Sequence, residues 1–473
     1  MAGLPCGGKY GIIYAMSIKR RDFLRTAAAS AVALSFPSLR ARAASPLGKV
    51  RMAFIGVGNR AGYDLAHFTG YYRDQIDVVA LCDTQMGASH TLKALRSFPQ
   101  VPRYTDFRKM LEKHGRQLDA VCIGTPDFSH FPAAMLAMSM GIAVYCEKPM
   151  CNNFREVALM TAAAKRYRVV TQMGNQGHSA ANYWQMKALV ESGYIKDVAR
   201  IDAFMCADRR WHKWKGTLRE MPGAEPKPAE MDWNAWLAQR PDRPYNRNFI
   251  NGDWRSFYEY GTGALGDWGA HIFDAAHEFL KLGLPTRIEM VKDEGNTPVV
   301  YPMASTIRYV FPARGPGLPA CTLNWHDGRG NYPAPLKNPT DPKWSRKNYG
   351  AELHLLDGRV FSRTSHDSPL QVVAGADPRA ADVKRAMRDY PRGKSEHYLN
   401  FLKAVRGEEK ANSDFSVAGP LSEVLALGAV AQRLGAPSLE FDPVKGKFVG
   451  NDAANAFLAG PPARKGWEEF EKL

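Results

Sequence analysis

The chain has 473 residues, of which 45% are hydrophobic and 23% charged, and it contains 7 cysteines. This composition excludes a disordered chain, a fibrous repeat and a small disulfide-stapled domain, and the length allows about three average domains. The net charge of +16 would suit nucleic acid or an anionic membrane as partner, unless part of the excess belongs to a removable segment.

The first 44 residues are predicted to be an export signal. A basic run containing Arg20 and Arg21 precedes an alanine-rich apolar stretch and Ala41-Arg42-Ala43, a small-x-small cleavage pattern, as in a twin-arginine signal. The apolar stretch spans about 11 residues against the roughly 20 of a spanning helix, so no membrane anchor is expected. Cleavage after Ala43 would remove seven basic residues and one acidic residue, and so lower the net charge to +10. We therefore expect an exported, periplasmic protein.

A nucleotide-binding pattern follows the signal. The β-rich run 49–55 leads into Gly56-x-Gly58-x-x-Ala61, in which small residues let the backbone approach a pyrophosphate at a helix N-terminus. A second apolar run ends in Asp83, where a carboxylate accepts hydrogen bonds from a ribose 2′-OH and repels a 2′-phosphate. This order of strand, turn, helix, strand and acid predicts NAD as the cofactor, with NADP less favoured.

Strands and helices continue to alternate as far as residue 175. The expected elements are strands at 119–124, 142–146 and 169–173 and helices at 129–140 and 153–167. Continuous apolar strands between helices predict a parallel sheet covered on both faces, an α/β Rossmann domain over residues 45–175. Ligands of such sheets bind beyond the carboxyl ends of the strands, so the residues near those ends are the candidate cofactor ligands. They are Gly56, Gly58, Asn59, Arg60, Asp83, Thr125, Pro126, His130, Glu147, Lys148, Asn175 and Gln176.

Three residues are candidates for catalysis. Lys148 directly follows a strand, where its amine can polarise or deprotonate a hydroxyl beside a nicotinamide; the alternative is an ordinary surface lysine. Asp267 and His271 lie four residues apart after the glycine-rich run 261–266, a spacing that places both on one helix face. His271 could then transfer a proton while Asp267 orients it, although a helix cap and a structural histidine are the simpler alternative.

An insertion at about 208–258 is rich in aromatic residues and prolines. Its functional interpretation is a wall of the substrate site, since aromatic faces stack on sugars and a guanidinium forks onto hydroxyls or a carboxylate; alternatively, the aromatics only pin the insertion to the domain. The candidate substrate-binding residues are Lys148, His178, Trp254, Arg255, Asp267 and His271. Later strands are expected at 287–291, 305–310 and 320–325, and later helices at 396–405 and 420–434.

Neither a metal site nor a nucleic-acid surface is predicted. His271 and His277 lie six residues apart, which suits one helix face poorly, and hydride chemistry needs no metal. The basic residues are scattered, so nothing resembles a nucleic-acid-binding surface.

Four motifs together resemble the Gfo/Idh/MocA oxidoreductase family. They are Gly56-x-Gly58, Thr125-Pro126 with His130, Glu147-Lys148-Pro149, and the run from Gly263 to His271 with its Asp-x-x-x-His. The resemblance implies a Rossmann domain, a C-terminal α/β domain at 176–473 with a large open, mostly antiparallel sheet that commonly forms homo-oligomers, and a carbohydrate or cyclitol substrate. It also implies Lys148, Asp267 and His271 as the catalytic trio. The chain further resembles the exported subgroup of glucose-fructose and aldose-aldose oxidoreductases, which hold their cofactor tightly.

Three functions follow from this pattern. The favoured one is an NAD(P)-dependent sugar oxidoreductase whose bound cofactor is reoxidised in place, because free cofactor is scarce outside the cytoplasm. A redox-neutral NAD-dependent glycosidase or lyase is the alternative, although such relatives often lack the lysine that this chain has at Lys148. A non-catalytic sugar-binding protein is the third.

Overall fold

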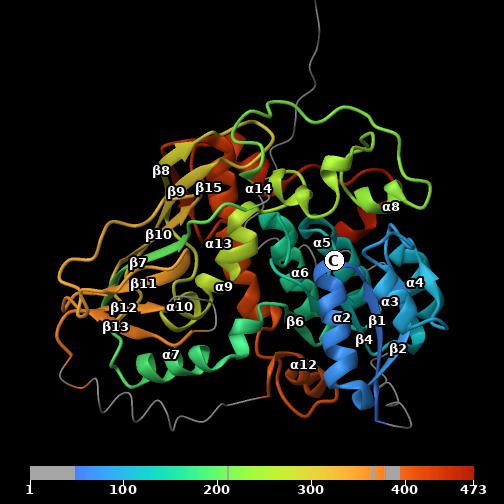
Figure 1. The fold of residues 1–473 in the computed structure, drawn as a ribbon, viewed down its shortest axis with the longest axis horizontal. Coiled ribbons are helices and arrows are strands. Elements are labelled where there is room, and N and C mark those ends of the chain that lie inside the picture. Colours follow the sequence, from blue (N-terminus) through green and yellow to red (C-terminus); the bar gives the residue numbers. More distant parts are fainter. Residues whose placement is uncertain (1–47, 210–211, 364–367, 378, 380–394, 473) are drawn as a thin grey trace, which may run out of the picture.

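The computed structural model describes residues 48–472, apart from 210–211, 364–367, 378 and 380–394. The expected export signal at 1–44 lies outside the described residues. The described chain forms two sheets that lie at opposite sides of the molecule in Figure 1, with α13 (Phe415–Leu434) between them.

The first sheet is parallel and has the strand order β3-β2-β1-β4-β5-β6. This is the order of a Rossmann fold, so the expected α/β class is confirmed. Its strands are β1 (Val50–Ile55), β2 (Ile76–Cys82), β3 (Arg103–Tyr104), β4 (Ala120–Ile123), β5 (Ala143–Cys146) and β6 (Thr171–Met173). The helices along this part of the chain are α2 (Asn59–Tyr71), α3 (Leu92–Ser97), α4 (Phe107–His114), α5 (His130–Ser139) and α6 (Phe154–Tyr167).

Both faces of this sheet are covered, which explains why its strands are continuously apolar. Along β1, Ala53 and Ile55 point into the core formed with α4, α5 and α6, whereas Met52 and Phe54 point into the opposite core. That opposite core includes α2, α3 and α12 (His397–Val405), a helix contributed from far along the chain.

The second sheet has nine strands in the order β13-β12-β11-β7-β10-β9-β8-β14-β15. Its neighbours are antiparallel except for β7 and β10, as expected for the C-terminal domain. The strands are β7 (Val198–Met205), β8 (Arg287–Glu294), β9 (Ala304–Phe311), β10 (Cys321–Asp327), β11 (Tyr349–Leu355), β12 (Val360–Arg363), β13 (Gln371–Ala374), β14 (Ser438–Asp442) and β15 (Lys447–Phe448). The remaining α-helices are α7 (Ala181–Glu191), α8 (Trp233–Leu237), α9 (Ala270–Ile272), α10 (Asp274–Phe279) and α14 (Asp452–Ala459). Homo-oligomerisation through this sheet stays a prediction.

Helix α13 joins the two halves of the molecule. It packs against α6 of the Rossmann domain and against β8 of the second sheet. By length and composition it is the one described helix that could cross a membrane, yet 78% of its most apolar window is buried inside the fold. A buried position of this kind is typical of a core helix.

His397 fixes the start of α12 against the end of the first sheet. Its Nε2 lies 2.9 Å from the Met173 carbonyl oxygen and its Nδ1 lies 2.8 Å from the Ser179 hydroxyl. A neutral ring satisfies both contacts by donating to the carbonyl and accepting from the hydroxyl. Burial, together with the neighbouring charge of His178, lowers the pKa of His397 to about 3.

Lowering the pH from 7 to 5 should therefore destabilise the wild type by about 2 kcal/mol more than the His397→Gln variant. The unfolded histidine has an ordinary pKa of 6.5, so the unfolded chain takes up the proton first as the pH falls. The stability supplied by neutral His397 is present above that pH and is lost towards pH 3. Urea unfolding at both pH values measures the effect, and equal pH dependence of the two proteins would contradict it.

Candidate active site

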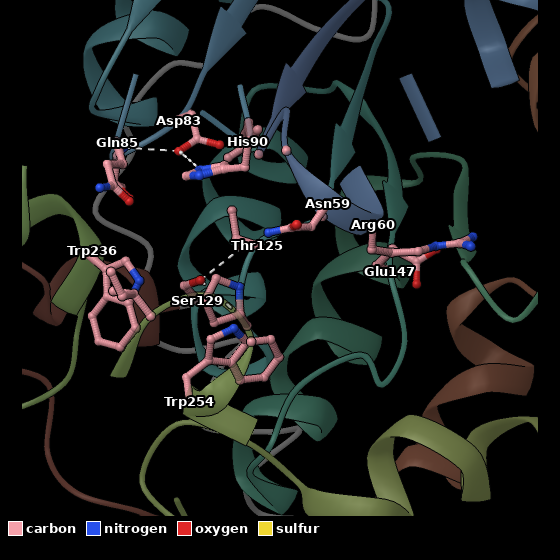
Figure 2. Close-up of a pocket in the computed structure, with 18 of the residues that line it drawn as sticks. Asn59, Arg60, Asp83, Gln85, His90, Thr125, Ser129, Glu147, Trp236 and Trp254 are labelled. Atoms are coloured by element: carbon pink, nitrogen blue, oxygen red, sulfur yellow. Dashed lines mark hydrogen bonds and ion pairs between the residues drawn. The ribbon is translucent and has the colours of Figure 1, made fainter. Parts of the chain in front are cut away.

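A cavity of about 290 Å³ lies beyond the carboxyl ends of β1, β2, β4 and β5. Figure 2 shows Asp83 and His90 towards one end of it and Trp236 and Trp254 towards the other. The residues predicted from sequence that line the cavity are Gly56, Gly58, Asn59, Arg60, Asp83, Thr125, Pro126, His130, Glu147, Lys148, Trp254, Arg255 and Asp267. The predicted residues that do not line it are Asn175, Gln176, His178 and His271.

The turn after β1 requires glycine at two positions. Gly56 has a φ of +86°, and a Cβ there would lie 2.9 Å from the carbonyl oxygen of Gly124. A Cβ on Gly58 would lie 2.2 Å from Cδ2 of His90. The backbone therefore carries no side chain at these two positions where α2 begins, so that a pyrophosphate could approach the N–H groups of the turn closely.

Asp83 closes this turn from the end of β2. Its carboxylate accepts from the backbone N–H groups of Val57 at 3.1 Å and Gln85 at 3.0 Å. His90 Nε2 lies 3.7 Å from Asp83 Oδ1, and this carboxylate raises the pKa of His90 although burial opposes it. Sequence reasoning missed His90 because it sits in a loop without a motif, and only the fold brings it over Gly58. The glycine turn and the acid together fit a dinucleotide with a free ribose 2′-OH.

The exposed Arg60 and the buried Glu147 form a polar cluster at the side of the cavity. Arg60 donates from Nε to Glu147 Oε1 at 3.1 Å and from Nη2 to the Tyr398 hydroxyl at 3.0 Å. Gln176 Nε2 also donates to Glu147 Oε1, at 3.0 Å. Figure 2 shows Arg60 extending beside Glu147 and away from Asp83. Gln176 thus acts from behind the cavity wall and holds Glu147 in place.

His130 links two loops of the site. Its Nδ1 lies 3.0 Å from the Pro149 carbonyl oxygen and its Nε2 lies 2.8 Å from the Thr125 carbonyl oxygen. Burial lowers the pKa of His130. The ring therefore fixes the loop that carries Lys148 relative to the loop that carries Thr125.

Lys148 and Asp267 meet at the centre of the site. Lys148 Nζ donates to Asp267 Oδ1 at 2.6 Å and to the Asp267 backbone carbonyl at 2.7 Å. Asp267 lies in a π-helical turn (Leu265–Gly269) that can approach closely because Gly266 carries no side chain: a Cβ there would lie 3.0 Å from Pro149 Cγ. The family resemblance had put both residues in one predicted trio, and in the structure they meet although 119 positions separate them. Their catalytic role stays a prediction.

Two arginines strengthen the charge at Asp267. Arg255 Nε lies 3.9 Å from Asp267 Oδ1, and Arg209 Nη2 lies 3.7 Å from Oδ2. Burial alone would raise the pKa of the Asp267 carboxyl, but Lys148 and the two arginines outweigh it and hold that pKa well below its usual range. Asp267 is therefore a permanent carboxylate at working pH.

Arg255 is itself held in place. Its Nη1 donates to Asp127 Oδ2 at 3.1 Å, and the same oxygen accepts from the Thr262 backbone N–H at 3.1 Å. The guanidinium also lies 4.5 Å from the centre of the Trp254 ring. This predicted substrate ligand thus lies at the cavity beside Asp267.

The structure places His178 elsewhere than expected. Its side chain is fully buried, with Nδ1 2.8 Å from Asp274 Oδ1 and Nε2 3.1 Å from the Asn412 carbonyl oxygen. His178 lies in a short 3-10 turn (Gln176–Ser179) between β6 and α7, and this turn directs the ring into the core instead of the cavity. Substrate contact by His178 is therefore corrected to a structural role.

Asn175 and His271 also stay off the cavity lining. Asn175 is fully buried at the end of β6. His271 is half-buried in α9, one turn beyond Asp267, and its carbonyl accepts from Arg363 Nη2 at 2.7 Å. The catalytic role of His271 stays a prediction.

Two family models match the chain, and together they cover more than half of it. A model described as an oxidoreductase family with an NAD-binding Rossmann fold matches residues 50–175. A model described as the C-terminal alpha/beta domain of an oxidoreductase family matches residues 180–304.

Two curated relatives and one solved structure extend the comparison. A "Glycosyl hydrolase family 109 protein" of Stenotrophomonas maltophilia is 35% identical over 140 residues, 28% of this chain and 30% of the relative. A second protein of the same name, from Shewanella pealeana, is 24% identical over 221 residues, which are 41% of this chain and 48% of the relative. The chain therefore spans less than half the length of each of these two relatives. The WlbA dehydrogenase of Bordetella pertussis, crystallised in complex with NADH and UDP-GlcNAcA, is 15% identical with a TM-score of 0.55 over 83% of this chain and 99% of that one. This likeness shows the fold alone.

Proposed function

Because the chain belongs to the Gfo/Idh/MocA oxidoreductase family, we propose that it transfers a hydride between a sugar or sugar derivative and a nicotinamide cofactor. The contact between Lys148 Nζ and Asp267 Oδ1, at 2.6 Å, carries this proposal. The Lys148 amine in this contact can accept or donate a proton, and it lines the same cavity as the Gly56 turn. The hydrogen bonds at Asp83 support NAD as the cofactor in preference to NADP.

The protein's part in the reaction is to remove one proton and hold the substrate. A bound nicotinamide would supply the hydride acceptor. Lys148, in its amine form, takes the proton of the hydroxyl that is being oxidised. Asp267 stays ionised and stabilises the resulting ammonium, while Arg255 holds Asp267 and offers a donor to the substrate. His271, one turn further on, is proposed to pass the proton onward.

The expected export signal implies that the cofactor stays bound. An exported enzyme cannot exchange NADH with a cytoplasmic pool, so two successive substrates would oxidise and reduce the same molecule in place. We propose a periplasmic location on these grounds. The family resemblance supports two further proposals, a carbohydrate substrate and association of subunits through the second sheet.

A second candidate function is a redox-neutral glycosidase that oxidises, eliminates and then reduces its substrate. The two relatives named glycosyl hydrolase family 109 proteins favour it. Lys148 favours the oxidoreductase, because such glycosidases often lack this lysine.

The experiment that separates the two functions uses the protein as isolated. Denaturation should release NAD(H), and a panel of aldoses should change the absorbance of the bound nicotinamide. Aryl glycosides should stay intact. Release of the aryl group without net redox change would instead establish the glycosidase, and a preparation that holds no nicotinamide would contradict in-place recycling.

A further inference from the structure

A second cavity, of about 420 Å³, lies apart from the candidate active site and shares no lining residue with it. It is bounded by α13, by α14 and by the chain between 240 and 260. The segment 254–261 separates the two cavities, since Arg255 lines the first and Tyr258 lines the second. Its volume falls within the range that holds small-molecule ligands.

Three arginines line this cavity, and carboxylates neutralise two of them. Arg240 is buried and donates from Nη2 to Glu156 Oε2 at 2.9 Å. Arg243 donates from Nη2 to Glu259 Oε2 at 2.8 Å. The third, Arg433, has no hydrogen bond or ion pair to any residue in the described part of the chain. The cavity therefore carries one positive charge without a counter-charge.

Aromatic rings hold the Arg433 guanidinium in position. Its Cζ lies 4.1 Å from the centre of the Phe457 ring and 5.6 Å from that of Tyr258. Burial lowers the pKa of Arg433, and the nearby Glu259 carboxylate, which pairs with Arg243, offsets this effect only in part. The place of Arg433 in the last turn of α13 suits a cation. Among the described residues, no hydrogen-bond acceptor meets the five N–H donors of its side chain.

The remaining walls suit a compact organic molecule. The rings of Tyr258 and Tyr301 pack 4.2 Å apart, between centroids, and both line the cavity. Arg243 uses Nε and Nη2 for described partners, and its Nη1 makes no hydrogen bond within the described residues. A planar guanidinium with aromatic neighbours matches an oxyanion carried on a partly apolar body.

We propose that this second cavity binds the oxyanion of a sugar-sized molecule, a carboxylate or a phosphate, with Arg433 as its anchor. Arg243 Nη1 supplies a second donor, and Tyr258 and Tyr301 contact the carbon face of the ligand. The site differs from the one where hydride transfer is proposed and does not depend on that function.

Isothermal titration of the isolated protein tests this site with four probes: inorganic phosphate, glucose 6-phosphate, glucuronate and neutral glucose. At least one anionic probe should bind saturably and more tightly than glucose. Arg433→Gln should weaken that binding by about tenfold or more, and Arg433→Lys, which keeps the charge without the planar fork, by less. The matched control is Arg329→Gln, at an arginine whose side chain is 82% exposed, which should bind like the wild type.

Each outcome has a clear meaning. Binding of glucuronate alone assigns a carboxylate ligand, and binding of the phosphates alone assigns a phosphate ligand. The proposal is overturned if no anion binds saturably, if glucose binds equally well, or if both Arg433 variants keep wild-type affinity. The thermal unfolding midpoint of each variant checks that it is folded without reference to the cofactor, so failure here is distinguishable from failure of the hydride-transfer proposal.

Discussion

Replacing Lys148 with methionine should lower kcat by about 10²–10⁴-fold, the usual contribution of a positioned acid or base. Methionine keeps the length of the buried stem but cannot accept the substrate proton. It also leaves Asp267 without the Nζ donor that lies 2.6 Å away. NADH affinity should change little, because Gly56, Gly58 and Asp83 are expected to make the main dinucleotide contacts. Steady-state turnover, and NADH fluorescence titration of protein freed of bound nicotinamide, measure the two effects separately.

Two further variants sharpen this test. Asp267→Asn removes the charge of the carboxylate while keeping its shape. The double variant Lys148→Met/Asp267→Asn should be no slower than Lys148→Met alone, because the two residues act as a unit. Lys187→Met, at a surface lysine 3.8 Å from Glu191, is the matched control and should keep wild-type turnover. Turnover of Lys148→Met within tenfold of the wild type would remove the lysine from the chemistry.

The Rossmann half of the fold could be predicted because its signals are local. Strands β1, β2, β4 and β5 are largely apolar runs followed directly by a glycine or an acid, and the carboxyl ends of parallel strands must meet at one edge. That rule placed Gly56, Asp83, Thr125, Glu147 and Asn175 at one edge of the sheet, and all of them except Asn175 line the cavity.

The second sheet was harder to predict. Strands such as β7 and β11 contain polar residues that are buried in the fold, and they pair over long sequence distances, as Asp202 does with Glu352. Helix α12 was expected near its observed position, but that it covers the Rossmann sheet through Tyr398 and Phe401 is a tertiary contact without a local signature.

The site shows the same division between local and tertiary signals. The family motifs placed Lys148 and Asp267 in one predicted trio, and the structure has them in contact. His178 was misplaced because a loop histidine after a strand can turn either towards solvent or into the core. Its partners Asp274 and Asn412 come from remote parts of the chain, so no spacing could have indicated them. His90 was missed for the same reason.

Replacing Gly56 with alanine should weaken NADH binding by about 100-fold and destabilise the protein by about 1–3 kcal/mol. The added Cβ would lie 2.9 Å from a backbone carbonyl oxygen of Gly124, which cannot rotate away as a side chain could. A φ of +86° is also unfavourable for alanine. Either β1 and β4 separate or the turn shifts, and both changes move the backbone that should approach the pyrophosphate.

Gly70→Ala is the matched control within the helix that this turn begins. Gly70 is exposed near the end of α2, and a Cβ there would meet no atom within 4 Å. Alanine should stabilise the helix by about 0.5–1 kcal/mol and leave NADH affinity unchanged. Thermal unfolding and NADH titration of both variants separate the close approach at Gly56 from a general effect of added methyl groups. If Gly56→Ala kept the wild-type Tm and affinity, the turn after β1 would not be what brings the cofactor against the sheet.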